Sequence, residues 1–456
     1  ANIKAIVDGA AWIDEDVSLS WMPLTHDMGL IGYHLSTMAA GMNQSLMETS
    51  LFVRRPLLWL KLATKLKATQ LCSPNFGYRH FLKMFYRKGI ENLDLSHIKL
   101  ILNGAEPISW NLCNEFLDTL EPFGLSRKSM FPVYGLAEAT VGVTFPKVGL
   151  LPERVIVDRH QLTLGQPCKP CPEDSQDAIS LVKVGKAIQF QEIRIVDEQD
   201  CHVNDSVIGH IQIKGENVTP GIFNDKIKTD SILTQDGWLR TGDCGFIDNN
   251  SLVITGRSKE LIIINGQNYY PHDLENIIEG LEKLDLGKVV VCGVKDEVEK
   301  LIVFILHRKD INSFRSIQEL VRNVISEKCG LEVNNVIPVS KIPKTTSGKV
   351  QRNNLAQEYL DGRFDQVIAE LTIESNAEVH NNEDKLLGEL LNICSEFSKD
   401  IKVGPDDNLF EVGLSSLTLA EIVMGVDEQY PGKLDVSDLF DYPTIRSVAG
   451  LIKKRD

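Results

Sequence analysis

The sequence predicts an α/β fold that continues into a small α+β unit and ends in an all-helical domain. Residues 1–257 alternate short strand-like runs with helical patterns, which is typical of α/β layering with mixed sheets. The chain has 456 residues, more than one hydrophobic core usually organises, so we expect two to four domains. Its 43% apolar and 24% charged residues fit a packed, soluble protein.

Local patterns predict two elements of the first region in detail. Pro56 favours the start of a helix because proline suits the first helical position, and Leu57–Leu66 then supply an apolar side. The run Ile98–Leu102 is apolar except for one lysine and predicts a strand. It is followed by Asn103-Gly104, at the kind of strand end where α/β folds bind ligands.

Composition predicts where the other segments lie. Prolines and an acidic patch indicate that about 152–183 is an inserted surface segment rather than core. Two strand-like runs and an amphipathic helix that ends near Gly330 predict an α+β unit over 258–360. Residues 361–382 show no clear periodicity and are expected to be a linker. Helical apolar stripes recur in 383–456, which is expected to be a separate acidic domain.

The charge and cysteine content exclude several classes of function. The net charge of −15 and the absence of a Lys/Arg stripe argue against nucleic acid as a partner. No apolar run approaches the roughly 20 residues of a membrane span, and no signal peptide is seen. Nine scattered cysteines predict a reduced, cytoplasmic protein, and Cys168 and Cys171 lack further ligands for zinc. The chain begins at Ala1 without methionine, so we expect a processed or truncated chain.

Five segments carry groups suited to activating a carboxylate with ATP, which requires a grip on adenine, ribose and phosphate and neutralisation of charge. The segments are Asn103-Gly104-Ala105-Glu106-Pro107, Tyr134-Gly135-Leu136-Ala137-Glu138, Asp236–Asp243, Gly256-Arg257-Ser258-Lys259-Glu260 and Pro343–Lys349. Together and in this order they resemble the adenylate-forming superfamily of acyl-CoA synthetases, peptide-synthetase adenylation domains and luciferases. The first two are weak signals alone, whereas the spacing of the third and fourth is specific.

The resemblance implies a role for individual residues. Asn103, Gly104, Ala105 and Glu106 would form the adenine-side loop. Tyr134, next to Gly135, would stack on adenine, and Glu138 would bind Mg²⁺, a hard cation that prefers carboxylate oxygen.

The remaining segments would complete the nucleotide site by the same resemblance. Asp243 would accept hydrogen bonds from both ribose hydroxyls, and Arg257 would contact ribose and phosphate. Lys259 sits at the family's hinge position, and Lys349 would be the adenylation lysine that stabilises charge at the α-phosphate.

One motif indicates the branch of the superfamily. His26-Asp27-Met28-Gly29-Leu30 resembles the motif of fatty acyl-AMP ligases and makes His26 a candidate catalytic residue, although a core histidine is the alternative. Ala137 and the 152–183 insertion also match that branch. In the family the insertion is thought to hinder the domain arrangement that admits free coenzyme A.

The last domain resembles acyl and peptidyl carrier proteins, which are four-helix bundles. Gly413-Leu414-Ser415-Ser416-Leu417 matches their phosphopantetheine motif, Gly-x-Asp-Ser-Leu, with Ser415 in place of the aspartate. The register makes Ser416 the residue expected to carry 4′-phosphopantetheine.

The sequence therefore predicts a ligase that uses ATP and Mg²⁺ to activate a fatty or related carboxylic acid as acyl-AMP and then loads its own carrier domain. Its expected partners are the acid, a phosphopantetheinyl transferase and downstream polyketide or peptide synthetase modules. An amino-acid-activating module and a non-catalytic carrier platform are the alternatives. The family's phosphate loop, expected before His26, is absent from the sequence, so this chain alone is expected to adenylate poorly.

Overall fold

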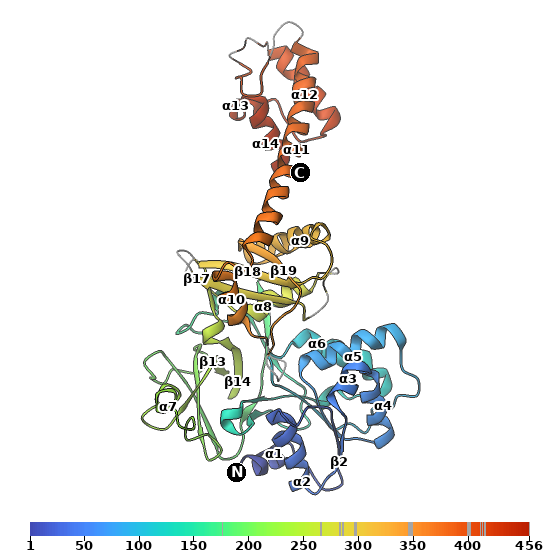
Figure 1. Cartoon of the computed structure of the whole chain (residues 1–456), viewed down its shortest axis with the longest axis vertical. Helices are drawn as coiled ribbons and strands as arrows, with labels where there is room; N and C mark the ends of the chain where they lie inside the picture. Colours follow the sequence, from blue (N-terminus) through green and yellow to red (C-terminus); the bar gives the residue numbers. More distant parts are fainter. Residues whose placement is uncertain are drawn as a thin grey trace. The chain divides into compact units, whose positions relative to one another are not determined.

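The computed structural model divides the chain into two compact units, Ala1–Arg363 and Phe364–Asp456 (Figure 1). For residues 372–385, 416, 417 and 440, only the backbone is described. The described residues are 1–175, 177–264, 267–281, 284, 287–295, 299–344, 350–398, 403–410, 412, 414 and 416–455.

The first unit is built on a five-stranded parallel sheet in the order β2-β1-β3-β4-β5. Strands β3, β4 and β5 are buried along their whole length because helices cover both faces, as is usual for parallel sheets. Figure 1 shows α3 to α6 grouped on one flank and α1 and α2 on the other. The strands are β1 (Val17–Ser20), β2 (Asn43–Leu46), β3 (Gln70–Cys72), β4 (Leu100–Asn103) and β5 (Met130–Pro132). The helices are α1 (Asn2–Gly9), the π-helix η1 (Met28–Leu35), α2 (Ser36–Ala39), α3 (Thr49–Arg54), α4 (Leu57–Leu66), α5 (Asn75–Lys88) and α6 (Trp110–Leu120).

The structure confirms the two elements predicted in detail in this region. Helix α4 begins at Leu57, directly after Pro56, and it buries Trp59, Leu60 and Ala63. Strand β4 ends at Asn103, so the following residues lie at the carboxyl edge of the parallel sheet.

Two antiparallel sheets follow, with strand orders β10-β7-β6 and β11-β12-β13-β14. The register of β13 against β14 places Asp243 opposite Arg257, next to an irregularity in the pairing at Cys244 and Gly245. The elements are β6 (Tyr134–Gly135), β7 (Gly142–Phe145), β10 (Lys186–Ala187), β11 (Gln191–Val196), β12 (Gly209–Gly215), α7 (Lys226–Ile232), β13 (Leu239–Asp248) and β14 (Ser251–Arg257). Short 3₁₀ turns are η2 (Glu121–Phe123), η3 (Arg127–Ser129), η4 (Ala137–Ala139), η5 (Arg159–Gln161) and η6 (Ser258–Glu260).

The segment predicted as a surface insertion is more ordered than its composition suggests. Strands β8 (Arg154–Asp158) and β9 (Ala178–Val182) pair antiparallel within it. Val157 and Leu181 pack in a small core that also contains Phe246 of β13. The prediction that this segment lies outside the core is therefore wrong for its two strands, because alternate apolar side chains face the neighbouring sheet.

The expected α+β unit is present after residue 258. Strands β15 (Ile262–Ile264) and β16 (Gln267–Tyr269) pair with each other, and β17 (Val289–Lys295), β18 (Glu299–Leu306) and β19 (Asn335–Val339) form a mixed sheet. Helices α8 (Pro271–Glu279), α9 (Asn312–Cys329) and α10 (Arg352–Leu360) accompany them. Helix α9 ends as predicted at Gly330, which adopts the left-handed conformation at φ 64°.

Two ion pairs connect the earlier part of the first unit to α8. Arg79 of α5 lies 2.6 Å from Glu279, and Arg159 of the inserted segment lies 2.6 Å from Asp273. Both acidic side chains are largely buried, at 7% and 17% exposure, so these pairs depend on good geometry to offset desolvation.

His272 of α8 gives a prediction about stability. Burial, and secondly the positive charge of Arg352, lower the pKa of His272 from its ordinary 6.5 to about 4. Between these values the unfolded chain binds a proton that the folded chain does not. The free energy of unfolding is therefore expected to fall as the pH is lowered from about 6.5 to about 4, by about 1–3 kcal/mol from this group. Urea denaturation across this range should show a weaker fall for His272→Gln, and an unchanged fall would contradict the assignment.

The second unit contains α11 (Asp365–Ser398), α12 (Ser416–Gln429), α13 (Asp438–Asp441) and α14 (Ile445–Lys454). Their apolar side chains form one core around Leu390, Ile422 and Ile452. The segment predicted to be a linker, residues 361–382, is mostly helical, because α11 runs through most of it. The sequence from Phe364 to Leu387 contains neither glycine nor proline, so the backbone can stay helical without an apolar stripe.

Among the described helices, none has the length and apolar character needed to cross a bilayer.

Gly29 of η1 is expected to be essential for packing of the first unit. A Cβ atom at this position would overlap the carbonyl oxygen of Pro23. Gly29→Ala is therefore expected to lower the free energy of unfolding by about 2 kcal/mol or more, because backbone must shift. Gly32→Ala is the matched control on the same helix, since its Cβ would lie 3.8 Å from Met28 Cγ. It is expected to change stability by less than about 1 kcal/mol in urea denaturation, and equal effects of both changes would refute the packing argument.

Candidate functional site

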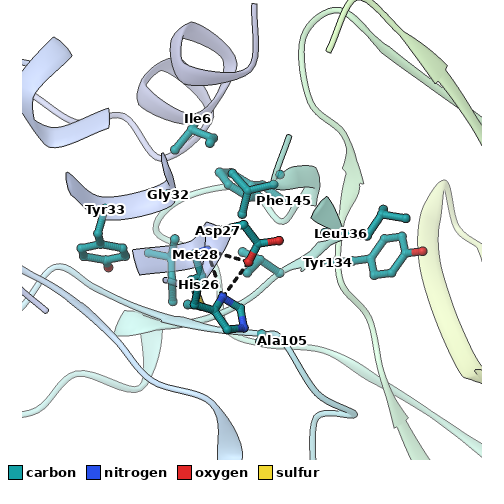
Figure 2. A pocket seen from close by; sticks show the side chains of 16 residues that line it. Ile6, His26, Asp27, Met28, Gly32, Tyr33, Ala105, Tyr134, Leu136 and Phe145 are labelled. Carbon is teal, nitrogen blue, oxygen red and sulfur yellow. Dashed lines mark hydrogen bonds and ion pairs between the residues drawn. The ribbon is translucent and has the colours of Figure 1, made fainter. Parts of the chain in front are cut away.

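An apolar pocket lies where the parallel sheet meets the β10-β7-β6 sheet (Figure 2). The centre of a water-sized sphere can reach about 60 Å³ of its interior. Its lining includes five residues predicted from the sequence: His26, Gly104, Ala105, Tyr134 and Gly135. The other lining residues are mainly apolar: Ile6, Asp27, Met28, Gly32, Tyr33, Leu102, Val133, Leu136, Val141, Gly142 and Phe145.

His26 is not a fully enclosed core histidine. Its side chain is 10% exposed, lines the pocket, and places Nδ1 2.6 Å from Asp27 Oδ1 (Figure 2). The backbone N–H of Met28 points to the same two groups, 2.7 Å from Asp27 Oδ1 and 3.2 Å from His26 Nδ1. These contacts at the start of η1 fix the ring at the pocket wall, where it can meet a ligand.

Backbone forms another part of the pocket wall. Ala105 has a φ of 72°, an unusual conformation for a residue with a side chain and one that is often found beside ligand sites. At Gly135, a Cβ atom would overlap the carbonyl oxygen of Val141, so only glycine allows β6 and β7 to approach each other there. The small residues in these two motifs thus permit close approach of main chain.

Tyr134, Asp243 and Arg257 form one hydrogen-bonded group beside the pocket. Tyr134 Oη donates to Asp243 Oδ2 at 2.6 Å, and Arg257 Nε donates to Asp243 Oδ1 at 3.0 Å. Figure 2 shows the Tyr134 hydroxyl directed away from the His26–Asp27 pair. Asp243 is buried, whereas the Arg257 side chain is 53% exposed and can reach a ligand from solvent.

The negative charge of Asp243 raises the pKa of both of its partners, Tyr134 and Arg257. Burial, and then the Asp243 carboxylate, raise the pKa of the Tyr134 hydroxyl well above its ordinary value, so Tyr134 remains a donor. The same carboxylate is the main cause that raises the pKa of Arg257. The group therefore presents a fixed carboxylate and a cation at the edge of an apolar pocket.

Three other predicted residues are not part of the pocket lining. Asn103 is buried, and its amide donates to Asn75 Oδ1 and Cys113 Sγ instead. Glu106 accepts a hydrogen bond from the backbone N–H of Phe76 at 2.8 Å. Glu138 is exposed on η4, two residues beyond the lining residue Leu136.

The other predicted residues lie elsewhere. Lys259 is exposed on η6, between Arg257 and the α+β unit. Ser416 is the first residue of α12 in the second unit, consistent with a modified serine at a helix start. Lys349 and Ser415 lie outside the described residues.

Among the described residues, no group of three or more His, Cys, Asp or Glu side chains is arranged to hold a metal ion.

Sequence reasoning missed most of the apolar lining. Ile6 comes from α1, Tyr33 from η1, and Val141 and Phe145 from the region of β7. No motif links these segments, and apolar residues in them are equally compatible with ordinary core positions.

Two family models match the chain. Residues 1–223 match the model described as AMP-binding enzyme, and residues 386–452 match the phosphopantetheine attachment site. The chain joins an AMP-binding domain to a phosphopantetheine carrier domain. In the AMP-binding domain the match covers the pocket and Tyr134, and in the carrier domain it includes Ser416.

Individual proteins are similar over most of the chain. A putative acyl-CoA synthetase of Caulobacter vibrioides (strain NA1000 / CB15N) is 34% identical over 374 residues, which are 80% of this chain and 64% of that protein. A long-chain-fatty-acid–AMP ligase of Mycobacterium tuberculosis (strain CDC 1551 / Oshkosh) is 32% identical over 368 residues, 76% of this chain and 62% of the ligase. The chain thus spans less than two thirds of the length of these curated relatives.

A solved structure is similar across both domains. The structure of McyG A-PCP complexed with phenylalanyl-adenylate covers 99% of this chain and 69% of its own, with 27% identity and a TM-score of 0.74. The first unit accordingly has the adenylate-forming α/β fold, and the helical carrier region follows it.

Proposed function

We propose that this chain belongs to an enzyme that activates a fatty or related carboxylic acid as acyl-AMP and transfers the acyl group to phosphopantetheine on its own Ser416. The observation that carries the proposal is the Tyr134–Asp243–Arg257 group beside an apolar pocket, in a chain that also has a carrier domain.

The residues of this group fit an adenylate. A carboxylate offers about four acceptor positions in fixed geometry, so Asp243 can accept from ribose hydroxyls beside its two protein partners. Arg257 would approach the phosphate from its exposed side, and the Tyr134 ring would border adenine. Bound Mg²⁺ would neutralise phosphate charge, and Glu138 is the residue proposed to hold it. Lys349 is proposed, from the sequence, to stabilise charge at the α-phosphate during adenylation.

The pocket supports an acid with an apolar chain as substrate. Of its lining side chains, only His26 and Asp27 carry an imidazole or a carboxylate, and these two lie against each other. The names of the relatives agree with this class, since they include an acyl-CoA synthetase and a long-chain-fatty-acid–AMP ligase. His26 is proposed to contact the reacting carboxylate or phosphate at the mouth of this pocket.

The inserted segment contacts the α+β unit and so opposes its movement. Its Arg159 contacts Asp273 of α8 at 2.6 Å, so the insertion holds the α+β unit directly. Movement of that unit about Lys259 would have to break this buried pair. The proposed partners are a phosphopantetheinyl transferase and downstream synthetase modules, and a cytoplasmic location stays a prediction from the sequence.

Mass spectrometry of the holo-protein tests the proposal. Acyl transfer is started either with ATP, Mg²⁺ and acid or with a synthetic acyl-adenylate, and Ser416 is examined for an acyl thioester. We expect fatty acyl groups, but not aminoacyl groups, to be loaded from the adenylate. Loading from ATP is expected to require Lys349, so Lys349→Ala abolishes it while loading from acyl-adenylate remains. Loading of amino acids alone supports the amino-acid-activating alternative, and no loading from either source supports the platform.

A further inference from the structure

A buried arginine connects the segment around Lys349 to the segment around Lys259. Arg352 is the first residue of α10, and its side chain is only 17% exposed. Nη2 and Nε contact the two oxygens of Glu275 at 2.6 and 3.2 Å, while Nη1 donates to Glu260 Oε2 at 3.2 Å. One guanidinium therefore joins α8 to η6, using the fork geometry that lysine lacks.

Glu275 gives this arrangement a rigid base. Its Oε1 also accepts a hydrogen bond from the backbone N–H of Val291 in β17 at 3.0 Å. The backbone carbonyl of Arg352 accepts a contact from Cys292 Sγ at 3.7 Å on the same strand. Arg352 is thus fixed by α8 and β17 from both its ends.

The two ends of the 345–349 segment lie next to Arg352. Lys344 and Val350 form an antiparallel bridge, and the backbone N–H of Gln351 donates to the carbonyl of Pro343 at 3.0 Å. The chain that enters and leaves the segment is therefore closed by backbone pairing, and Arg352 follows immediately.

Glu260 interacts with two arginines, Arg352 of α10 and Arg257 at the end of β14. Arg352 contacts it directly, and Glu260 also helps to raise the pKa of Arg257, which pairs with Asp243. A chain of charges consequently runs from Asp243 through Arg257 and Glu260 to Arg352.

We propose that Arg352 is a positioning residue that fastens the closed ends of the Lys349 segment to the hinge segment through Glu260. Both Glu260 and Arg352 follow Lys259 in the chain, so their pair would make the hinge segment and the paired residues on either side of 345–349 move as one body. This matters for adenylation because misplacement of a charged group by about 1 Å costs on the order of 100-fold in rate. The inference rests on the proposed function for its catalytic meaning, but the anchoring itself depends only on these contacts.

Glu260→Ala tests the link without leaving a buried charge unpaired, because Arg352 keeps Glu275. Two readouts are needed. In hydrogen–deuterium exchange on the full chain, the Gln351 amide is expected to exchange about 10-fold faster or more, because the neighbouring Arg352 loses one of the two carboxylates that hold it. In pyrophosphate exchange, adenylation is expected to fall about 10- to 100-fold, while loading of Ser416 from supplied acyl-adenylate stays within about 3-fold. Loss of a purely structural contact would lower both activities together.

Matched variants complete the design. Glu260→Gln keeps an oxygen that can accept from Arg352 and is expected to restore most of both readouts. Glu358→Ala removes the partner of Arg363, an exposed ion pair at 2.7 Å elsewhere in the first unit, and should change neither readout. Unchanged exchange at Gln351 in Glu260→Ala overturns the inference, as does faster exchange with undiminished adenylation. If pyrophosphate exchange by the wild-type chain is too slow to measure, the hydrogen–deuterium exchange measurement alone decides the anchoring.

Discussion

Ser416→Ala is expected to abolish attachment of phosphopantetheine, and Ser415→Ala is expected to leave it intact. Ser416 is the first residue of α12, and the attachment-site match covers residues 386–452. Transfer of the pantetheine arm requires a hydroxyl at one defined position, and alanine offers no nucleophile. The measurement is the mass of the intact protein after incubation with coenzyme A and a phosphopantetheinyl transferase of broad specificity.

The comparison of the two serines resolves the departure from the usual carrier motif. Ser415 replaces the common aspartate, so the sequence offers two neighbouring hydroxyls. If the Ser416→Ala variant still receives phosphopantetheine, now on Ser415, the attachment site lies one residue earlier than assigned and the assignment of Ser416 is wrong. Helical circular dichroism of both variants should match the wild type, because each change is a single small substitution.

Asp243→Ala is expected to weaken binding of an acyl-adenylate analogue by about 100-fold or more. The change removes the acceptor proposed for both ribose hydroxyls and leaves Tyr134 and Arg257 without their partner. Loss of a hydrogen-bonding group that a site was built around costs far more than loss of apolar contact. Isothermal titration calorimetry with a non-hydrolysable acyl-sulfamoyl adenosine measures the effect without requiring ATP turnover.

A matched carboxylate provides the control. Asp200 pairs with Arg240 through Nε at 3.1 Å and lies beside the same four-stranded sheet. Asp200→Ala also removes a carboxylate from an arginine, yet it is expected to change the affinity by less than about 3-fold. Equal losses in the two variants would show that Asp243 acts through general stability. The loss of affinity in Tyr134→Phe should lie between the losses in Asp200→Ala and Asp243→Ala, because this change keeps the aromatic ring and removes one hydrogen-bond donor to Asp243.

Local patterns predicted the elements that depend on neighbouring residues. The start of α4 after Pro56 and the end of α9 at Gly330 follow from backbone preferences of proline and glycine, which act within one or two residues. The apolar run at 98–102 identified β4 for a similar reason. A segment without such markers was harder to read: 361–382 was expected to be a linker and is mostly helical, in a stretch with neither glycine nor proline after Gly362.

At the candidate site, too, the motifs predicted some features and missed others. The motifs identified Tyr134, Asp243 and Arg257, and the structure brings all three together. It does not bring Asn103 or Glu138 into the lining of the pocket, although both lie close to it in the chain. Side-chain direction decides this, and direction depends on the packing of β4 against α6 and on the turn after Leu136.

The sequence by itself determined the order of the motifs, the chemistry of their side chains and the two kinds of domain, because these are properties of short segments. The tertiary structure alone decided that Tyr134 reaches Asp243 across 109 residues and that Arg352 reaches Glu260 across 92. It also decided that apolar residues of α1, η1 and β7 line one pocket. Such contacts follow from strand register and helix packing, where a shift of one residue turns a side chain to the opposite face, and no short segment encodes that choice.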